Sequence, residues 1–297
     1  MNTNEASAGV LYLCATPIGN LEDMTFRAVR MLGEVDLIAA EDTRHTRKLL
    51  THYDIHTPLT SYHEHNKLEK GPELVAELLN GKSIACVSDA GLPGICDPGS
   101  HLAELCIAEG IQVSPLPGAN AGLSALICSG QDTTEFSFIG FLPKTSRKVA
   151  ELLERIRSYQ GTLIFYEAPH HLKNTLSQLV KVLGPERQAT ACRELTKKFE
   201  EFRRSTLQEL LDYYSVNEPR GEFVIIVSGA DEAGEGGNSE ETAQSPEEMV
   251  ARLEGQGYSR KEAMRETAKR LGMSRRDVYQ LLLKYKSNYI HGGNSIV

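Results

Sequence analysis

The feature that most constrains the fold is a regular alternation of short apolar runs and amphipathic segments along the first half of the chain. Apolar runs at 9–16, 36–42 and 82–89 have the length and composition of buried strands, and segments with helical spacing of apolar residues follow them. Strands that alternate with helices predict a mostly parallel sheet, because a crossover helix returns the chain to start the next strand. We therefore predict an α/β domain over residues 1–135.

A second run of strands and helices follows over residues 136–229. It begins with a segment at 136–148 that breaks the rhythm and is interpreted as a crossing between domains. Residues 230–246 are acidic and rich in Gly and Ser, a composition typical of flexible linkers. The sequence therefore predicts a second α/β domain over 136–229 and a linker at 230–246.

The C-terminal segment 247–297 has a different pattern. Helices are predicted at 260–270 and 275–284, and the short turn between them gives helix-turn-helix spacing. Arg275 and Arg276 open the second helix, the position from which such modules contact nucleic acid. We predict a small all-helical module that binds nucleic acid, and a plain helical hairpin is the alternative.

Charge and composition narrow the setting in which the protein works. The net charge is −8, yet residues 246–297 hold ten Lys or Arg against six Asp or Glu. A basic end on an acidic protein is consistent with a nucleic-acid contact, although two solvated charged helices give the same count. The six cysteines lie far apart, no apolar run reaches 18 residues, and the first ten residues do not resemble a signal peptide. We expect a cytoplasmic protein without disulfides and without a membrane partner.

Three glycine-rich loops follow predicted strands: "PIGN" at 17–20, "SDAGLPGICDPGS" at 88–100 and "PLPGANAG" at 115–122. The carboxyl ends of parallel strands share one edge of a sheet, so three such loops favour a ligand pocket there. Glycine lets a ligand lie against the backbone, whose N–H groups can hold a carboxylate or a ring nitrogen. The usual nucleotide-binding fingerprints are absent, since no G-x-G-x-x-G follows a strand.

With these motifs, the chain resembles the tetrapyrrole-methylase superfamily and, within it, the ribosomal RNA small subunit methyltransferase I family. The matching stretches cover about residues 10–229 and include "LYLCATPIGNLEDMTFRAVRML", "AAEDTRHTRKLL", "YHEHN", "VSDAGLPGICDPG", "PLPGANA", "GFLP", "FYEAPHHL", "CRELTKKFEE" and "GEFVIIV". The resemblance implies two α/β domains of tetrapyrrole-methylase type with the cofactor cleft between them. It implies S-adenosyl-L-methionine as methyl donor and the ribose 2′-hydroxyl of a 16S rRNA cytidine, in the assembled small ribosomal subunit, as acceptor. It also implies a homodimer.

The resemblance places the cofactor on residues of both domains. Ser88-Asp89-Ala90 stands where the superfamily commonly has Gly-Asp-Pro, so the resemblance marks it as a variant of the rRNA branch. The residues carried over are Pro17, Asp89, Ala90, Gly91, Ile95, Pro117, Gly118, Ala121, Tyr166, Leu195 and Gly221.

A ribose 2′-hydroxyl is a weak nucleophile, so in-line placement and a general base would assist methyl transfer. The candidates for this base are Glu41, His63 and Asp89, with Asp42, Glu64, His65 and His170 as further possibilities. We favour Glu41 and His63. Asp42 is equally well explained as the cap of the following helix, and Asp89 as a residue that holds its own loop. His63 and His65 have no third ligand at metal-binding spacing, so no metal site is predicted.

Basic residues follow several of the predicted strand ends, as expected for an acceptor that carries phosphates. Ordinary solvated side chains would explain any one of them. The predicted RNA contacts are Arg44, Arg47, Lys144, Arg147, Lys148, Arg193, Lys197, Arg275 and Arg276.

Two other functions remain open at this point. A methylase of a corrin or porphyrin ring would predict a cleft without basic residues and no nucleic-acid tail. A helix-turn-helix DNA-binding regulator, whose α/β part only senses a metabolite, would predict a stronger basic face and leaves the acid-bearing loops unexplained.

Overall fold

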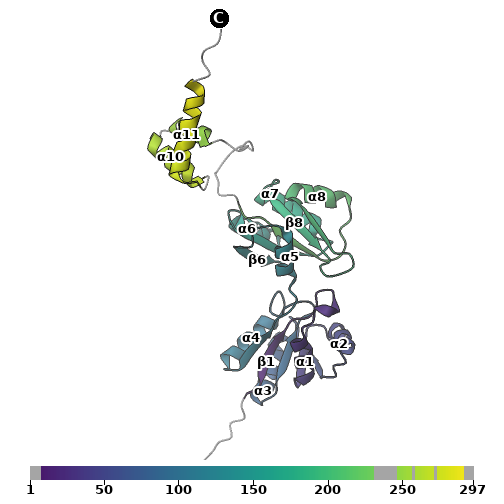
Figure 1. The fold of residues 1–297 in the computed structure, drawn as a ribbon. Coiled ribbons are helices and arrows are strands. Elements are labelled where there is room, and N and C mark those ends of the chain that lie inside the picture. The colour runs from purple at the N-terminus through teal and green to yellow at the C-terminus, as the bar shows by residue number, and fades with distance from the viewer. Residues whose placement is uncertain (1–7, 231–245, 256–257, 271–272, 291–297) are drawn as a thin grey trace, which may run out of the picture. The chain divides into compact units, whose positions relative to one another are not determined.

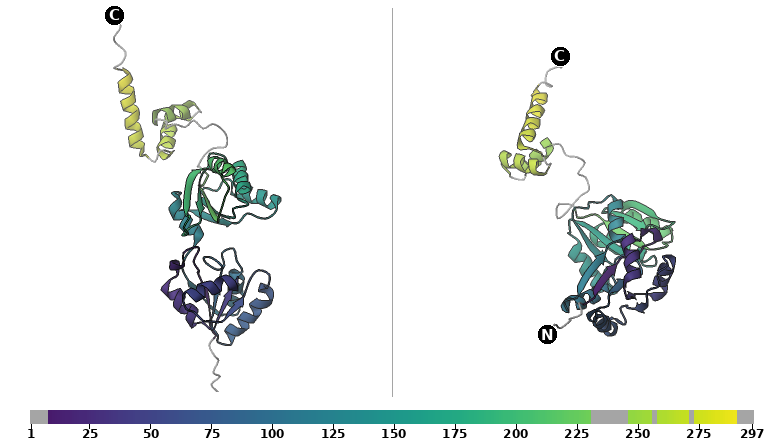
Figure 2. Two further views of the ribbon diagram at one scale, coloured as in Figure 1. Left: turned by 90° about the vertical axis from the view of Figure 1, so that its right-hand side faces the viewer. Right: turned by 60° about the horizontal axis from the view of Figure 1, so that its bottom comes forward.

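The computed structural model of the chain describes residues 8–230, 246–255, 258–270 and 273–290. The chain divides into two compact units, Met1–Ala233 and Gly234–Val297, which are described separately. The first unit contains two five-stranded sheets, and Figures 1 and 2 show that each has its own helices. The two-domain α/β class predicted from the sequence is therefore confirmed.

The first sheet has the strand order β3-β2-β4-β1-β5, and every neighbouring pair is parallel, as predicted. The central strand β4 is buried along its whole length, which explains its continuous apolar run. The elements of this sheet are β1 (Val10–Cys14), α1 (Phe26–Glu34), β2 (Leu37–Ala40), α2 (Thr43–His52), β3 (Leu59–Ser61), α3 (Lys67–Leu79), β4 (Ile84–Val87), α4 (Gly99–Ala108) and β5 (Gln112–Leu116).

Helices cover both faces of this sheet. On one face, buried residues of α3 and α4 such as Leu78 and Leu102 pack on Ile84. On the other face, Leu32 of α1 and Leu50 of α2 pack on the alternate strand residues. Successive side chains of each strand point to opposite faces, so each strand contributes to both cores. The loops follow the carboxyl ends of the strands (Figure 1).

The second sheet has the order β6-β7-β10-β8-β9 and is mixed. Only β6 and β7 are parallel, while the other neighbouring pairs are antiparallel. The elements of this half are α5 (Ala121–Ser129), β6 (Phe136–Gly140), α6 (Ser146–Ile156), β7 (Thr162–Glu167), α7 (Leu172–Leu183), β8 (Gln188–Arg193), β9 (Glu201–Thr206), α8 (Leu207–Val216) and β10 (Phe223–Val227).

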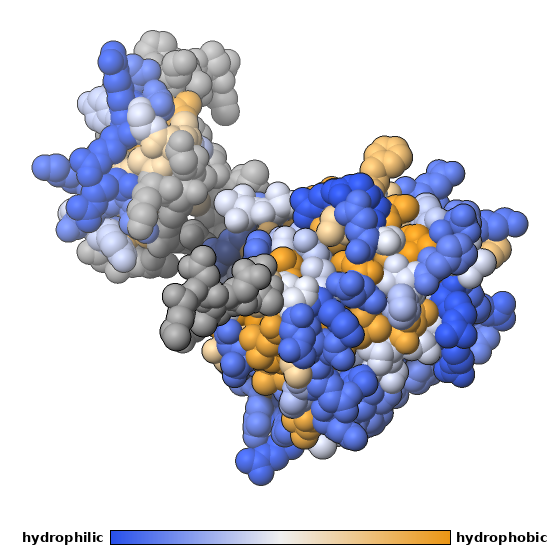
Figure 3. Space-filling model, turned by 90° about the horizontal axis from the view of Figure 1, so that it is seen from below, coloured by the Kyte–Doolittle hydropathy of each residue, from blue (hydrophilic) through white to orange (hydrophobic). Residues whose placement is uncertain are grey.

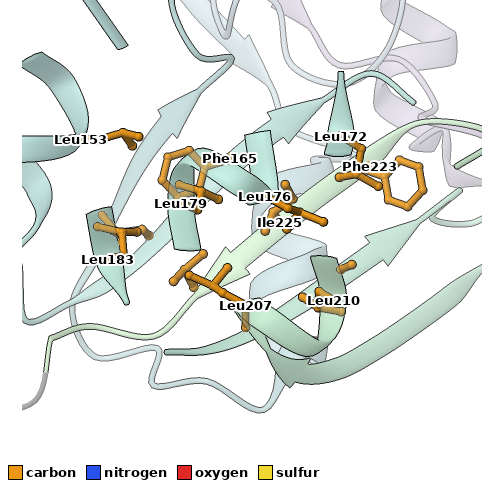
Figure 4. Packing of buried hydrophobic residues seen from close by; sticks show 14 of the residues in the cluster. Leu153, Phe165, Leu172, Leu176, Leu179, Leu183, Leu207, Leu210, Phe223 and Ile225 are labelled. Atoms are coloured by element: carbon orange, nitrogen blue, oxygen red, sulfur yellow. The ribbon is translucent and has the colours of Figure 1, made fainter. Parts of the chain in front are cut away.

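The largest core of the molecule fills the space between this sheet and helices α6, α7 and α8. Figure 4 shows Phe165 and Ile225 of the sheet facing Leu176, Leu179 and other leucines of the helices. On the opposite face, Ala125 and Leu126 of α5 pack against the sheet. Helix α5 lies within the range predicted for the first domain, yet its core contacts are with the second sheet. The predicted domain limits themselves remain a prediction.

Two segments differ from the sequence-based expectation. The segment 136–148 contains strand β6, and the stretch after β8, which its polar residues predict to be a turn, contains strand β9. These are the two edge strands of the sheet, and an edge strand needs apolar residues on only one side. In β9 the exposed and half-buried positions carry arginines, which hides the strand pattern.

In the second unit, the described residues form three helices: α9 (Pro246–Gly255), α10 (Arg260–Arg270) and α11 (Arg275–Ile290). Val250, Leu253, Ala263 and Val278 form its small core, which confirms the predicted helical module. The predicted linker 230–246 lies, apart from its two end residues, outside the described residues.

The surface in Figure 3 is mostly hydrophilic with scattered apolar side chains, as expected when the cores lie inside. None of the helices that the structure describes is both long and apolar enough to cross a membrane.

Candidate active site

A cavity of about 340 Å³ lies where the loops of the first sheet meet the second sheet. It is lined on one side by residues after β2 and β4, and on the other by residues of β7, β8 and β10. Of the predicted catalytic and cofactor residues, the structure brings together Glu41, Asp89, Ala90, Gly91, Ile95, Ala121, Tyr166 and Leu195. It is therefore the candidate active site.

The loop from Ser88 to Pro98 forms the floor of the cavity on the side of the first sheet. Gly91 has a φ of +81°, a conformation that favours glycine, and its N–H and C=O pair with the backbone of Thr16. The carboxylate of Asp97 accepts the N–H groups of Gly94 and Gly99, each at 2.8 Å. The loop is thus held by its own hydrogen bonds and by those to the neighbouring loop after β1.

Three carboxyl groups, those of Glu41, Asp89 and Asp97, line this side of the cavity. Partial burial raises the pKa of Glu41, and the negative charges of Asp89 and Asp97 raise it further, against a hydrogen bond from the Asp89 N–H and the charge of His63. Burial likewise raises the pKa of Asp97, against the N–H groups that it accepts. A carboxylate whose pKa is raised accepts a proton more readily, which suits Glu41 to the role of a general base.

Asp42, the neighbour of Glu41, is a helix cap. Its Oδ1 accepts the Arg44 N–H at 2.8 Å, and its Oδ2 lies 2.8 Å from Nη2 of the same residue. These bonds with Arg44 hold the pKa of Asp42 well below its usual range. Of the two explanations for Asp42, the structure supports the cap.

Asp89 has a structural bond as well as a place in the cavity. Its Oδ1 accepts the backbone N–H of Asp42 at 3.0 Å. The sequence suggested that Asp89 holds its own loop. Instead it ties that loop to the end of β2, next to Glu41.

His63 does not line the cavity, although its charge acts on Glu41. Its backbone N–H donates to Oδ1 of Asn66 at 2.8 Å. Its Nδ1 is buried and has no hydrogen-bond partner within the described part of the chain. Its ring packs edge-on against His65 at a centroid distance of 6.0 Å. His63 is therefore placed beside the candidate base rather than in contact with the cavity.

The opposite wall contains an aromatic group next to Glu167, Lys197 and Glu222. The hydroxyl of Tyr166 accepts the N–H of Gly122 at 3.0 Å, and burial raises the pKa of this tyrosine. The rings of Phe138 and Phe141 pack edge-on against Tyr166 at centroid distances of 5.0 and 5.7 Å. Tyr166 and Phe141 thus give the cavity an aromatic side suited to a purine ring.

Four predicted cofactor residues lie outside the lining: Pro17, Pro117, Gly118 and Gly221. Gly118 and Gly221 are explained by packing, because an added Cβ would lie 2.9 Å from the Cβ of Ala15 and 2.5 Å from the side chain of Glu194, respectively. Gly221 also has a φ of +79°. Both glycines thus allow neighbouring segments to approach, and their contact with a cofactor remains a prediction.

Sequence reasoning missed several lining residues: Ile18, Ser88, Leu92, Cys96, Asp97, Asn120, Phe141, Glu167, Ala168, Cys192, Glu222, Phe223 and Val224. Most of them lie one or two positions from a predicted residue, within the same quoted motifs. Glu167 carried a signal, since an acid at the end of an apolar strand is unusual. Its Oε2 accepts the Thr175 hydroxyl at 2.5 Å and its Oε1 accepts the Ala168 N–H, so it is held rigidly.

The predicted RNA contacts fall into two groups. Arg193 and Lys197 are engaged internally: Arg193 donates to the Arg220 carbonyl at 2.7 Å, and Lys197 Nζ lies 2.6 Å from Glu222 Oε2 and 3.1 Å from Glu194 Oε1. The other group is exposed and comprises Arg44, Arg47, Lys144, Arg147, Lys148, Arg275 and Arg276.

Comparison with known proteins decides the family. The family model of the tetrapyrrole (corrin/porphyrin) methylases matches residues 10–211. A ribosomal RNA small subunit methyltransferase I from Halalkalibacterium halodurans is 50% identical, over 92% of this chain and 94% of the relative. The chain belongs to the ribosomal RNA small subunit methyltransferase I family. A member of this family from Synechocystis sp. is 48% identical, over 94% of this chain and 99% of the relative.

Membership of the ribosomal RNA small subunit methyltransferase I family confirms the resemblance seen in the sequence motifs. The fold is shared more widely. A uroporphyrin-III C-methyltransferase from Thermus thermophilus, solved with S-adenyl homocysteine, superimposes with a TM-score of 0.54 at 15% identity, over 74% of this chain and 97% of that one. At this identity the likeness concerns the fold alone, so it gives no support to a tetrapyrrole substrate. The relatives are methyltransferases by name, and none of those described supports the DNA-binding regulator considered above.

Proposed function

We propose that the protein transfers a methyl group from S-adenosyl-L-methionine to the ribose 2′-hydroxyl of a cytidine in 16S rRNA, in the assembled small ribosomal subunit of the cytoplasm. The observation that supports this most directly is the cavity at the strand ends, with a carboxyl group of raised pKa on one wall and an aromatic group on the other. The names of the relatives supply the rRNA substrate class.

The residues of the cavity fit the proposed cofactor. S-adenosyl-L-methionine supplies an electrophilic methyl group on a positively charged sulfur when it is bound. The carboxylates of Asp89 and Asp97 suit a cationic ligand, Tyr166 and Phe141 suit its adenine, and the fixed backbone from Ala90 to Leu92 suits its polar groups. The residues outside the lining would support the backbone of the lining residues: Pro17, Pro117, Gly118 and Gly221.

Glu41 is the proposed general base. The Glu41 carboxylate would accept the 2′-hydroxyl proton as that oxygen is methylated, and bound S-adenosyl-L-methionine would supply the methyl group and the sulfur leaving group. Asp89 would hold the backbone next to Glu41 through its bond to Asp42, and His63 would set the local charge. No residue of this scheme needs a metal ion.

The proposed homodimer has a candidate interface on the first unit. Helix α5 is apolar around its whole circumference, and Leu123 and Ile127 are exposed on the side away from its sheet. Ile107 at the end of α4 is exposed as well. A helix that is apolar on all sides is normally buried, so a second copy of this chain would cover the free side of α5.

The C-terminal unit is proposed to contact rRNA through the start of α11. The Ser274 hydroxyl accepts the Asp277 N–H and donates to the Asp277 carboxylate, which caps the start of α11, and Arg275 and Arg276 are exposed in its first turn. Two arginines at this position can reach phosphates.

A methyl-transfer assay tests the proposal. The purified protein is incubated with radiolabelled S-adenosyl-L-methionine and small subunits from cells that lack the enzyme, alongside free rRNA, DNA and a porphyrin precursor. We expect label in subunit rRNA as an alkali-resistant dinucleotide, the product of 2′-O-methylation. Label in the porphyrin precursor alone, or in an rRNA base, would contradict the proposal.

A further inference from the structure

The charge of the cavity suits one of the two proposed substrates, the cofactor, and not the other, the RNA. Five carboxyl groups line it, those of Glu41, Asp89, Asp97, Glu167 and Glu222. The single lysine in the lining, Lys197, pairs with Glu194 and Glu222. A cavity of this charge suits a cationic cofactor and repels an RNA phosphate. The phosphates next to the acceptor ribose must therefore be held outside the cavity.

The nearest element outside the cavity on the side of Glu41 is helix α2. The chain passes from Glu41 through the cap Asp42 directly into this helix. A groove on its exposed face is lined by Arg44, Arg47, Lys48 and Thr51. The proposed base and a cationic groove thus follow each other in the chain without an intervening loop.

The side chains in this groove are not equivalent. Arg44 pairs with Asp42, and the Thr51 hydroxyl donates to the Arg47 carbonyl at 2.8 Å. The charged groups of Arg47 and Lys48 are exposed and have no hydrogen-bond or ion-pair partner within the described ranges of the chain. An unpaired, exposed cation can bind a phosphate without first breaking an ion pair.

We propose that Arg47 and Lys48 form a phosphate subsite that holds the RNA strand next to the methylated ribose. This inference rests on the proposed function and names the part of the surface that positions its acceptor. Arg44 keeps its bond to the cap and fixes the start of α2. Arg193 and Lys197, whose charged groups already have partners, do not contribute to the subsite.

A pair of double variants tests the subsite. Arg47→Ala/Lys48→Ala removes both free cations. The matched control, Arg155→Ala/Lys181→Ala, removes two exposed cations from the last turns of α6 and α7. These turns lie away from the cavity. The cavity is at the carboxyl ends of β6 and β7, and α6 and α7 run back from those ends toward the starts of the strands. Both proteins carry the same change in net charge.

The Michaelis constant for small subunits and the dissociation constant of S-adenosyl-L-methionine are measured over a range of salt concentrations. For the α2 variant we expect the Michaelis constant to rise about tenfold or more near physiological salt. The slope of log affinity against log salt should fall by about one for each phosphate that the variant no longer binds. Cofactor affinity should equal that of the wild type, and the control variant should match the wild type throughout.

Two outcomes would overturn the subsite. In the first, the α2 variant and the control change the Michaelis constant for small subunits equally. In the second, the α2 variant lowers the affinity for the cofactor and leaves the Michaelis constant for small subunits unchanged. The swap Arg47→Lys/Lys48→Arg, which keeps both charges, should retain most of the affinity. If the wild type binds the cofactor but methylates no subunit, the proposed function fails, and that result differs from a failure confined to the α2 variant.

Discussion

The two sheets of the first unit contribute differently to the candidate active site. The first sheet is entirely parallel, so all its strands end at one edge, and their loops bring Glu41, Asp89 and Asp97 together. The second sheet is mixed and contributes mainly a side wall, with Tyr166 and Phe141 as its aromatic part. The carboxyl groups of Glu41, Asp89 and Asp97 thus come from loops at strand ends, while the aromatic group comes from β7 and from the residue that follows β6.

The difference follows from backbone geometry. Carboxylates at a strand end can accept N–H groups from the loops there, as Asp89 and Asp97 do. Tyr166 lies within a strand whose backbone groups are already paired, so it contributes to the cavity through its side chain. If this division is correct, a change at Glu41 should affect the rate of methyl transfer, and a change in the aromatic group of the second wall should affect cofactor affinity.

The largest effect is expected for Glu41→Gln. Loss of a general base should lower kcat by about 10²–10⁴ while cofactor affinity changes only a few-fold, measured by single-turnover methyl transfer and calorimetry. The control is Asp42→Asn, which removes the neighbouring charge but keeps the helix cap, and it should retain activity. Equal losses in both variants would show that the local charge, rather than a proton acceptor, matters.

The raised pKa of Glu41 predicts a pH signature for the same variant. Because Glu41 acts when ionised, wild-type activity should rise with pH through a value above the ordinary 4.5, and Glu41→Gln should lack this step. A carboxyl group whose pKa is raised by folding stabilises the folded state at low pH, and this contribution is lost as pH rises through the folded pKa. At neutral pH, Glu41→Gln should therefore melt at a higher temperature than the wild type, as thermal unfolding would show.

A smaller effect is expected for Tyr166→Phe on the second wall. The change leaves the N–H of Gly122 without its acceptor, which should lower the free energy of unfolding by about 1–3 kcal/mol and weaken the cofactor. Urea denaturation and calorimetry measure the two quantities. Tyr12→Phe removes a hydroxyl that has no bonding partner in the described structure and serves as the control. A drop in kcat without a change in cofactor affinity would break the proposed division between the walls.

The smallest effect is expected for Asp42→Ala. Loss of the α2 cap should lower the free energy of unfolding by about 1 kcal/mol, and Asp42→Asn should restore most of it, because an asparagine oxygen can also cap. Urea denaturation of the two variants checks this. A loss of activity in Asp42→Asn as large as that in Glu41→Gln would mean that the cap position takes part in the chemistry.

The first sheet was predictable because its signals are local. Each strand is a short apolar run, each helix has its own apolar face, and the glycine-rich loops mark the strand ends. Strands β6 and β9 were not predictable, because they are edge strands whose identity depends on pairing with β7 and β8. Arginines on β9 made that segment look like a polar turn.

The candidate site shows the same limit. The sequence indicated Glu41 and Tyr166 through the motifs around them, and it offered both a cap and a catalytic role for Asp42. It could not reveal that Lys197 pairs with Glu194 and Glu222, because those contacts join segments that are distant in the chain or depend on the path of a loop. Spacing predicts which residues share a strand end, whereas ion pairing depends on the three-dimensional structure.

The single hydrogen bond from Asp42 to Asp89 joins the floor of the cavity to the start of α2. A cofactor that displaces the floor therefore also displaces the helix proposed to hold the RNA strand. Affinities linked in this way form one thermodynamic cycle, so the coupling is reciprocal. If the bound cofactor raises the affinity for the acceptor by some factor, the bound acceptor raises the affinity for the cofactor by the same factor. The two substrates would then assemble cooperatively, and Asp89 would contribute to that cooperativity without touching the RNA.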